Sequence, residues 1–218
     1  MKILDVKQGS EEWLAARAGI VTASELGALL TPTLKPTDSQ GRMTYLYTKL
    51  AERWQGFPMP SYGGGVMEQG SILEGEALPW YAVRFKAKPK RVGLVLTDCG
   101  RFAASPDGLL PEVGLEIKCP QPPNHVKWLL DGRIPPEHLL QCYGGMFATG
   151  YKAWDFVSYC RGFPPLVRRL ERDEKVMDLI LGQVERVTET LDEWTEKLKE
   201  ANGGKGPSDS ETDDIGPF

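Results

Sequence analysis

The chain has 218 residues, of which 41% are hydrophobic and 26% are charged, and its formal net charge is −4. No apolar run approaches the roughly 18 residues that a membrane-spanning helix needs, and no signal peptide is evident. This composition is that of an ordinary globular protein and excludes a transmembrane helix, so we expect a cytoplasmic protein with no membrane partner.

The first part of the chain predicts a short strand followed by helices. The strand is expected at 1–5. Ser10 begins the first helix, because two glutamates follow this N-cap residue and suit the positive end of the helix dipole. Further helices are predicted at 43–54 and 66–85, separated by loops rich in proline and glycine.

A short helix is also predicted from Thr22 to Leu30, since Thr22-Ala23-Ser24-Glu25 has the pattern of a capping box. The free N–H groups at such a helix start form a candidate phosphate site, with Arg17 close by in the sequence. Capping alone explains Thr22 but does not explain Arg17.

Strands and helices alternate in the second half of the chain. The strands are predicted at 92–97, 101–110, 114–119, 154–160 and 166–171, with helices at 124–130 and 137–149. Asp173 caps a long amphipathic C-terminal helix that ends near Ala201. The fold class is therefore α/β, with a mixed central β-sheet flanked by helices. We expect one domain, 1–202, and a disordered acidic tail, 203–218.

The hairpin from Ser105 to Lys118 carries the main chemical signal. Asp107 precedes a tight turn at 111–114, and Glu116 and Lys118 follow it. Side chains alternate along a strand, so Glu116 and Lys118 share one face and Ile117 faces the core. The returning strand brings Asp107 opposite them. Two carboxylates and a backbone carbonyl suit a hard cation such as Mg²⁺, and a lysine can orient the attacking water. The alternative is a surface salt bridge of little energetic value.

Charge and cysteine content leave a nucleic-acid substrate open. The acidic tail accounts for most of the net charge. Basic residues cluster elsewhere and suit phosphate, although solvated surface charge is an equal alternative. The four cysteines include no C-x-x-C pair, which argues against zinc or iron–sulfur sites. The two basic clusters are Lys86, Lys88, Lys90 and Arg91, and Arg168, Arg169 and Arg172.

Four blocks in this order resemble the lambda-exonuclease-type (YqaJ-like) viral recombination nucleases of the PD-(D/E)xK superfamily. The blocks are Arg17 to Glu25, Gly70 to Glu74, Ala104 to Pro120, and Gln141 in its predicted helix, and the resemblance covers roughly residues 10–175. It implies a restriction-endonuclease-like core.

The resemblance also implies a role for individual residues. Asp107, Glu116 and the Ile117 carbonyl would bind the metal, and Lys118 would activate the water. The implied supporting residues are Glu74 beside the metal, Gln141 near Lys118 or the scissile phosphate, Arg17, Ser24 and Ser105 in a 5′-phosphate pocket, and Met43 and Met67 as wedges that splay the DNA end. His138 stands where the family has an aromatic residue, and a catalytic role for it is left open.

The function implied is a Mg²⁺-dependent 5′-to-3′ exonuclease on double-stranded DNA ends, with Mn²⁺ as an alternative ion. It would release 5′-mononucleotides and leave 3′ single strands for recombination by strand annealing. A homotrimer, a cognate single-strand annealing protein and a bacteriophage origin in a bacterial cell follow from the same resemblance. The alternatives are an endonuclease of the same superfamily and a non-enzymatic DNA-end-binding recombination protein.

The tail ends in Asp213-Asp214-Ile215-Gly216-Pro217-Phe218, like the tip of bacterial single-stranded DNA-binding proteins. It could dock on host replication proteins, shield a DNA channel, or act as a solubilising extension.

Overall fold

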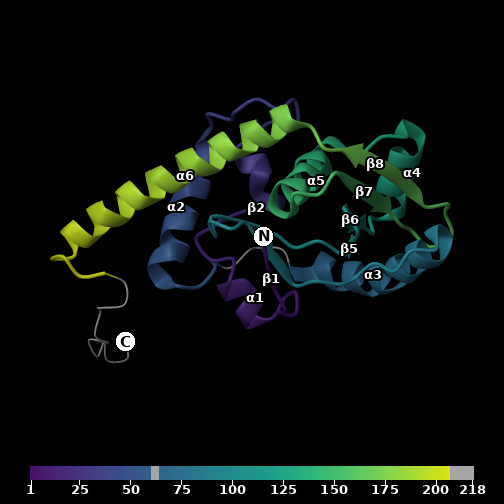
Figure 1. Ribbon diagram of the computed structural model, residues 1–218, viewed down its shortest axis with the longest axis horizontal. Helices are drawn as coiled ribbons and strands as arrows, with labels where there is room; N and C mark the ends of the chain where they lie inside the picture. Colours follow the sequence, from purple (N-terminus) through teal and green to yellow (C-terminus); the bar gives the residue numbers. More distant parts are fainter. Residues whose placement is uncertain (60–63, 207–218) are drawn as a thin grey trace.

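The computed structural model describes residues 1–59 and 64–206. It contains two four-stranded sheets with helices packed around them (Figure 1). This arrangement confirms the α/β class, although the predicted central sheet is divided into two. None of the helices in these two ranges has the length and apolar character needed to cross a membrane.

The first sheet has the strand order β1-β3-β4-β2. β1 (Lys2–Leu4) pairs antiparallel with β3 (Leu94–Leu96), and β3 pairs antiparallel with β4 (Phe102–Ala104). β2 (Val21–Thr22), which the sequence did not predict, lies parallel to β4. The sheet thus brings the start of the chain and residues 21–22 beside the segment that enters the hairpin of Asp107 and Lys118.

The second sheet has the order β5-β6-β7-β8 and holds the hairpin. β5 (Gly108–Leu110) pairs antiparallel with β6 (Val113–Lys118), which pairs parallel with β7 (Ala153–Ser158). All six residues of β7 are buried, as expected for a central strand. β8 (Leu166–Glu171) closes the sheet antiparallel to β7.

Helices cover both faces of the second sheet. α4 (Pro122–Asp131) and α5 (Pro136–Thr149) connect β6 to β7, and α5 packs against both strands. α3 (Gly64–Phe85), with Pro79 inside it, packs against β6. Figure 1 shows the sheet between α3 on one side and α4 and α5 on the other.

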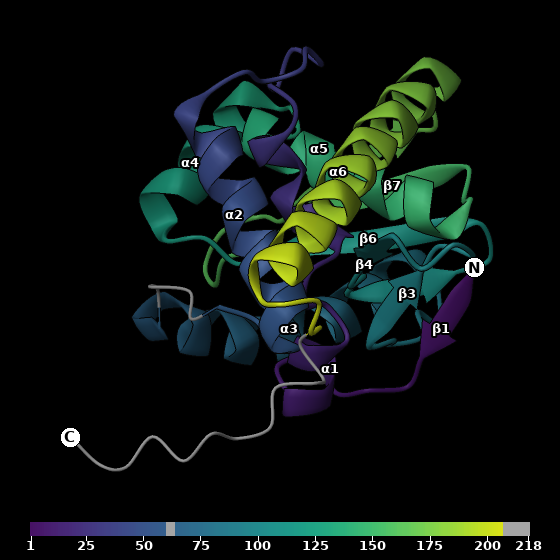
Figure 2. The ribbon, with the colours of Figure 1, turned by 90° about the vertical axis from the view of Figure 1, so that its left-hand side faces the viewer.

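Three further α-helices complete the described part of the chain. α1 (Glu11–Ala15) is capped by Ser10, whose hydroxyl accepts a hydrogen bond from the Trp13 N–H, as predicted. α2 (Gln40–Gln55) and the long α6 (Glu174–Ala201) pack against each other (Figure 2). Their contact includes a stacked pair of rings, Tyr47 and Trp194, with centroids 5.2 Å apart.

The hydrophobic core has two parts. The larger joins the first sheet, α5 and the buried face of α6. The smaller lies between α3 and β6, where Ala77 and Tyr81 pack near Leu115 and Ile117. This smaller cluster fixes α3 against the strand that carries the predicted catalytic residues.

Two predicted elements differ from the structure. The strand expected at 101–110 is interrupted at 105–107, so β4 and β5 belong to different sheets. Pro106 has no N–H for a continuous ladder, which accounts for the break. The helix expected at 22–30 is a 3₁₀ helix, η1 (Ala23–Ala28). Thr22 makes no capping bond; its hydroxyl donates instead to Glu25 Oε2 at 2.8 Å.

Candidate active site

The hairpin brings Asp107 beside the middle of β6. Its backbone N–H donates to the Leu115 carbonyl at 3.1 Å, and its Oδ2 accepts the Ile117 N–H at 2.6 Å. In the turn, Glu112 adopts a φ of 61°. The side chain of Asp107 is therefore held next to the peptide between Glu116 and Ile117, as the hairpin model predicts.

Glu116 and Lys118 form an ion pair, with 2.6 Å between Lys118 Nζ and Glu116 Oε1. Their side chains are 4% and 30% exposed, respectively, so the pair is not the exposed surface bridge considered as the alternative. Ile117 is 1% exposed and points into the smaller core cluster. A buried carboxylate is costly unless it is paired, and here the lysine supplies that charge.

Glu74 adds a third carboxylate from α3. Burial raises its pKa, while the positive charges of Lys118 and Arg91 oppose that rise. Burial raises the pKa of Asp107 well above its ordinary value, and repulsion from Glu116 and Glu74 adds to the effect. Glu74 raises the pKa of both Asp107 and Glu116, and Glu116 also raises that of Asp107, so the three acids share one electrostatic site.

The pKa shifts of Glu116 and Lys118 show how burial and charge oppose each other in this site. Burial raises the pKa of Glu116, against the attraction of Lys118. Burial lowers the pKa of Lys118, but Glu116, Asp107 and Glu74 together outweigh it and leave that pKa raised. One ammonium thus faces three carboxyl groups, which leaves an excess of acidic groups for a further cation.

The donor set fits a hard divalent cation. It consists of carboxylate oxygens and the backbone carbonyl of Ile117, the ligand types that Mg²⁺ takes. Among the side chains that the structure describes (1–59 and 73–206), no three histidine, cysteine or acidic groups converge in a way that could hold a metal ion. The ion pair with Lys118 explains this for Glu116, since the ammonium occupies the position of a cation beside its carboxylate.

Gln141 and His138 lie on α5, the helix that packs against β6. Gln141 is half-buried, and its side chain makes no hydrogen bond to any of the described residues. The His138 ring stacks on Phe156, with centroids 5.6 Å apart, and meets Trp128 edge-on. Burial and the charge of Lys118 lower the pKa of His138 to about 4, which keeps the ring neutral. These contacts describe a packed core histidine.

Arg17, Ser24 and Ser105 meet beside the break between β4 and β5. One guanidinium nitrogen of Arg17 lies 3.4 Å from Ser105 Oγ, and the other lies 3.4 Å from Ser24 Oγ. The residues implied by resemblance are thus brought together. A six-residue 3₁₀ helix gives no helix-terminus site, so any anion binding here rests on these side chains.

Trp13 and Thr22 also belong to this cluster, and sequence reasoning missed both of these roles. The Trp13 ring lies under the Arg17 guanidinium at 4.2 Å, and its N–H donates to Ser105 Oγ at 2.9 Å. Thr22 Oγ1 accepts from Arg17 at 3.3 Å. The chain separation between Trp13 and Ser105 left no local signal for their contact.

A buried charge network lies behind Arg17. Lys49 Nζ contacts Glu25 and Glu52, each at 2.9 Å, and Glu52 also accepts the Gly19 N–H at 3.1 Å. Lys49 and Glu52 are 3% and 5% exposed. Burial lowers the pKa of Arg17, and Glu25 and Glu52 oppose that shift. The i,i+3 spacing of Lys49 and Glu52 was the available sequence signal.

The two predicted wedge residues have different outcomes. Met43 lies on α2, half-buried, and packs against the larger core cluster. Met67 lies in α3, but its side chain is outside the described residues.

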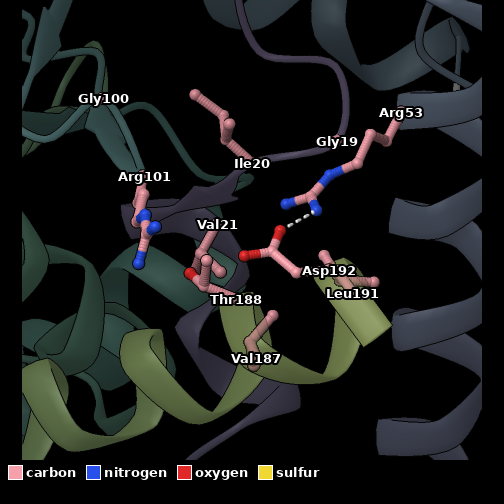
Figure 3. A pocket seen from close by; sticks show the side chains of 10 residues that line it. All are labelled: Gly19, Ile20, Val21, Arg53, Gly100, Arg101, Val187, Thr188, Leu191 and Asp192. Carbon is pink, nitrogen blue, oxygen red and sulfur yellow. Dashed lines mark hydrogen bonds and ion pairs between the residues drawn. The ribbon is translucent and has the colours of Figure 1, made fainter. Parts of the chain in front are cut away.

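A cavity of about 150 Å³ between α2, α6 and the turn at Gly100 contains none of the predicted site residues. Figure 3 shows the ion pair that crosses it, in which Arg53 from α2 contacts Asp192 from α6 at 2.6 Å. The four cysteines are free thiols, as expected.

The two mixed sheets, the flanking helices and the acid–lysine hairpin define a nuclease of the restriction-endonuclease-like fold. More particularly, the chain belongs to the YqaJ-like viral recombinase domain family, whose model matches residues 12–152. This match confirms the family indicated by the sequence blocks. A search of curated proteins gave no match.

Solved structures agree with this assignment. The alkaline exonuclease LHK-Exo from Laribacter hongkongensis is 30% identical, with a TM-score of 0.80 over 89% of this chain and 98% of its own. Its complex with dAMP matches equally well, at 31% identity. A phage-related exonuclease from Haemophilus somnus shares the fold at 14% identity, with a TM-score of 0.67 over 82% of this chain and 96% of its own. Together with the family, these neighbours support an exonuclease that acts in recombination.

Proposed function

We propose that this nuclease is a Mg²⁺-dependent exonuclease that degrades the 5′-ended strand of duplex DNA from an end. It releases 5′-mononucleotides and leaves 3′ single strands for strand annealing. The observation that best supports this proposal is the segment 105–107, which joins two clusters of side chains. Ser105 belongs to the Arg17 cluster, and Asp107, two residues later, belongs to the acidic site. Anion-binding groups and hydrolytic groups therefore adjoin.

The residues of the hairpin divide the chemistry between them. Asp107, Glu116 and the Ile117 carbonyl hold the cation, with Glu74 beside them. Bound Mg²⁺ supplies neutralisation of the phosphate charge and an acidified water. The Lys118 ammonium, which lies beside Glu116, would orient the attacking water and stabilise the developing negative charge. Gln141 supports Lys118 or the scissile phosphate.

The Arg17 cluster is the proposed pocket for the terminal 5′ phosphate. Arg17 offers a fixed guanidinium, and both serine hydroxyls can donate to phosphate oxygens. Ser105 Oγ already accepts from Trp13 and Arg17, at 2.9 and 3.4 Å, which leaves its own hydrogen for a ligand. The complex of LHK-Exo with dAMP, a 5′-mononucleotide, is consistent with this product class.

The experiment that tests the proposal uses one linear duplex labelled at either the 5′ or the 3′ terminus. With Mg²⁺, the 5′ label should appear at once as mononucleotide, while the 3′ label stays in long strands. Covalently closed circular DNA should remain intact. Early release of the 3′ label would overturn the polarity, cleavage of the circle would support the endonuclease alternative, and no release at all would support the non-enzymatic one.

The pocket is tested by comparing 5′-phosphorylated and 5′-hydroxyl ends of the same duplex. Phosphorylated ends should be digested faster, and Arg17→Gln should reduce that ratio toward one. Arg53→Gln is the matched control, because Arg53 is paired with Asp192 outside the pocket. Equal rates on both ends in the parent protein would remove the pocket from the proposal.

The remaining parts of the proposal rest on the family resemblance. They are a homotrimer, Mn²⁺ as an alternative ion, a cognate single-strand annealing protein, and Met43 and Met67 as wedges at the DNA end. The acidic tail, 203–218, has a proposed docking role on host replication proteins. Pull-downs with and without the tail test that role, and identical host partners would reject it.

A further inference from the structure

Asp155 is a buried carboxylate that the catalytic scheme does not use. It lies on β7, directly opposite Leu115 of β6, and is 3% exposed. Three donors surround it: the Tyr81 hydroxyl at 2.5 Å, and Arg169 Nε and Nη2 at 2.7 and 2.8 Å. We call these three residues the Tyr81 cluster. It ties α3 to the two strands β7 and β8.

Tyr81, the member of this cluster on α3, lies on the same helix as Glu74. Seven residues, or two helical turns and about 10 Å of rise, separate Tyr81 from Glu74. Tyr81 is 1% exposed and packs with Ala77 in the cluster that includes Leu115 and Ile117. Glu74 and the hairpin acids therefore come from separate elements, and their relative position depends on how α3 sits on the sheet.

The Tyr81 hydroxyl makes the one polar bond among the described residues that fixes this buried face of α3 to the sheet. Glu76 also links α3 to Arg161, but this pair lies at the surface, where the side chains are 36% and 64% exposed. A charge-assisted bond in a buried site constrains position more than an exposed pair does.

We propose that Tyr81, Asp155 and Arg169 are positioning residues that hold Glu74 at the distance from Asp107 and Glu116 that divalent-cation binding needs. This inference rests on the proposed metal-dependent function. None of the three residues contacts the cation or the DNA; they act through α3. Loss of the Tyr81 hydroxyl leaves Asp155 paired with Arg169, so it loosens the helix without leaving a buried charge unpaired.

The test measures Mn²⁺ binding in the absence of DNA, from the electron paramagnetic resonance signal of the free ion. Tyr81→Phe should raise the Mn²⁺ dissociation constant about tenfold or more, since mutation of groups that orient metal ligands typically reduces affinity by about 10- to 100-fold. Arg169→Lys keeps the charge but loses the two-pronged contact, and it should act in the same direction. Glu76→Gln, on the same helix, should match the parent.

A double-mutant cycle separates positioning from general weakening. In a Glu74→Gln background, Tyr81→Phe should produce no further loss of Mn²⁺ affinity, because the residue it positions is already changed. Melting temperatures of all variants are recorded alongside. Parental Mn²⁺ affinity in Tyr81→Phe, or equal losses with and without Glu74, would overturn the inference. If Tyr81→Phe does not fold, Arg169→Lys decides the question by the same cycle.

Different results would contradict the proposed exonuclease activity and the proposed positioning role of the Tyr81 cluster. A parent protein that binds Mn²⁺ but releases no nucleotide from duplex DNA contradicts the proposed exonuclease, while the binding cycle still decides the role of the Tyr81 cluster. A parent that releases nucleotide, with Tyr81→Phe needing no more Mg²⁺ than the parent does, contradicts the inference alone.

Discussion

Lys118 stands at the centre of the site because its ammonium faces all three carboxylates. Its Nζ lies 2.6 Å from Glu116 Oε1, and the negative charges of Asp107 and Glu74 also raise its pKa. Under the proposed function, this lysine acts in the chemical step rather than in holding the duplex, since phosphate contacts elsewhere supply most of the affinity for DNA.

We therefore predict that Lys118→Ala retains DNA binding and loses hydrolysis by at least about 100-fold, the scale of general acid–base contributions. Gel shifts and nucleotide release measure the two properties. Lys152→Ala is the matched control, since Lys152 pairs with Glu112 at the far end of the same hairpin at 3.0 Å. Digestion by Lys118→Ala at the parental rate would refute the role.

The titration of His138 should make the free energy of unfolding depend on pH. Its pKa is about 4 in the folded protein, because of burial and the charge of Lys118, against about 6.5 in an unfolded chain. Between these values the unfolded chain binds a proton and the folded protein does not. The free energy of unfolding should therefore fall as pH drops from about 6.5 to 4, by on the order of 2 to 3 kcal/mol.

Urea unfolding at several pH values in this window checks the prediction. His138→Phe keeps the aromatic contacts with Phe156 and Trp128 and should remove this part of the fall. An unchanged pH dependence in His138→Phe would assign the titration to other groups.

Residues near in sequence were predictable and distant partners were not. Asp107, Glu116 and Lys118 follow from strand alternation and a short turn, so local rules suffice. The contact of Tyr81 with Asp155 spans 74 residues and depends on how α3 packs. Nothing in the sequence around Tyr81 distinguishes it from an ordinary buried aromatic residue.

At the scale of elements, helices and strands were predicted where periodicity was strong. The helix of α6 and the strand β8 agree closely with the expected 173–201 and 166–171. The break at Pro106 was missed, because a strand pattern on both sides of a proline does not show that the two halves join different sheets. The two-residue strand β2 is too short for any periodic signal.

The two basic clusters, at 86–91 and 168–172, differ in the contacts that their side chains make. Arg168 bonds to the Gly132 carbonyl, Arg169 to Asp155, and Arg172 to Glu174 and the Met146 carbonyl. The three side chains of that cluster are therefore used in contacts within the protein. The segment from Lys86 to Arg91 is different: its four basic side chains are exposed and form no ion pair with the described residues. Lys90 exchanges two backbone bonds of 2.8 Å with Leu109, which places the segment beside β5.

We predict that changing Lys86, Lys88 and Lys90 to Gln weakens DNA binding and reduces its salt dependence. The slope of log affinity against log salt concentration should become shallower by about one for each lysine that no longer neutralises a phosphate. Binding isotherms at several salt concentrations measure it. Lys127→Gln, Lys175→Gln and Lys205→Gln, made together, provide a control of equal charge. An unchanged slope in the first variant would exclude the segment from the DNA path.

For the whole molecule, the described part of the chain provides one acid–lysine hairpin and one Arg17 cluster. Under the proposed function, each subunit of an assembly would therefore carry its own complete site. The homotrimer implied by resemblance predicts a particle mass about three times the 24.2 kDa of the chain. Sedimentation equilibrium at the concentrations used for digestion measures this mass. A monomer mass throughout would reject the trimer while leaving the hairpin chemistry unaffected.

The break at Pro106 has a consequence for the reaction. Two residues of extended chain span at most about 7 Å, and that span separates Ser105 from Asp107. Under the proposed function, this short peptide connects the pocket for the 5′ phosphate of the DNA strand with the site that cuts the phosphodiester bond. An inserted residue at this point would move the Arg17 cluster away from the acidic site and should therefore impair digestion of 5′-phosphorylated ends.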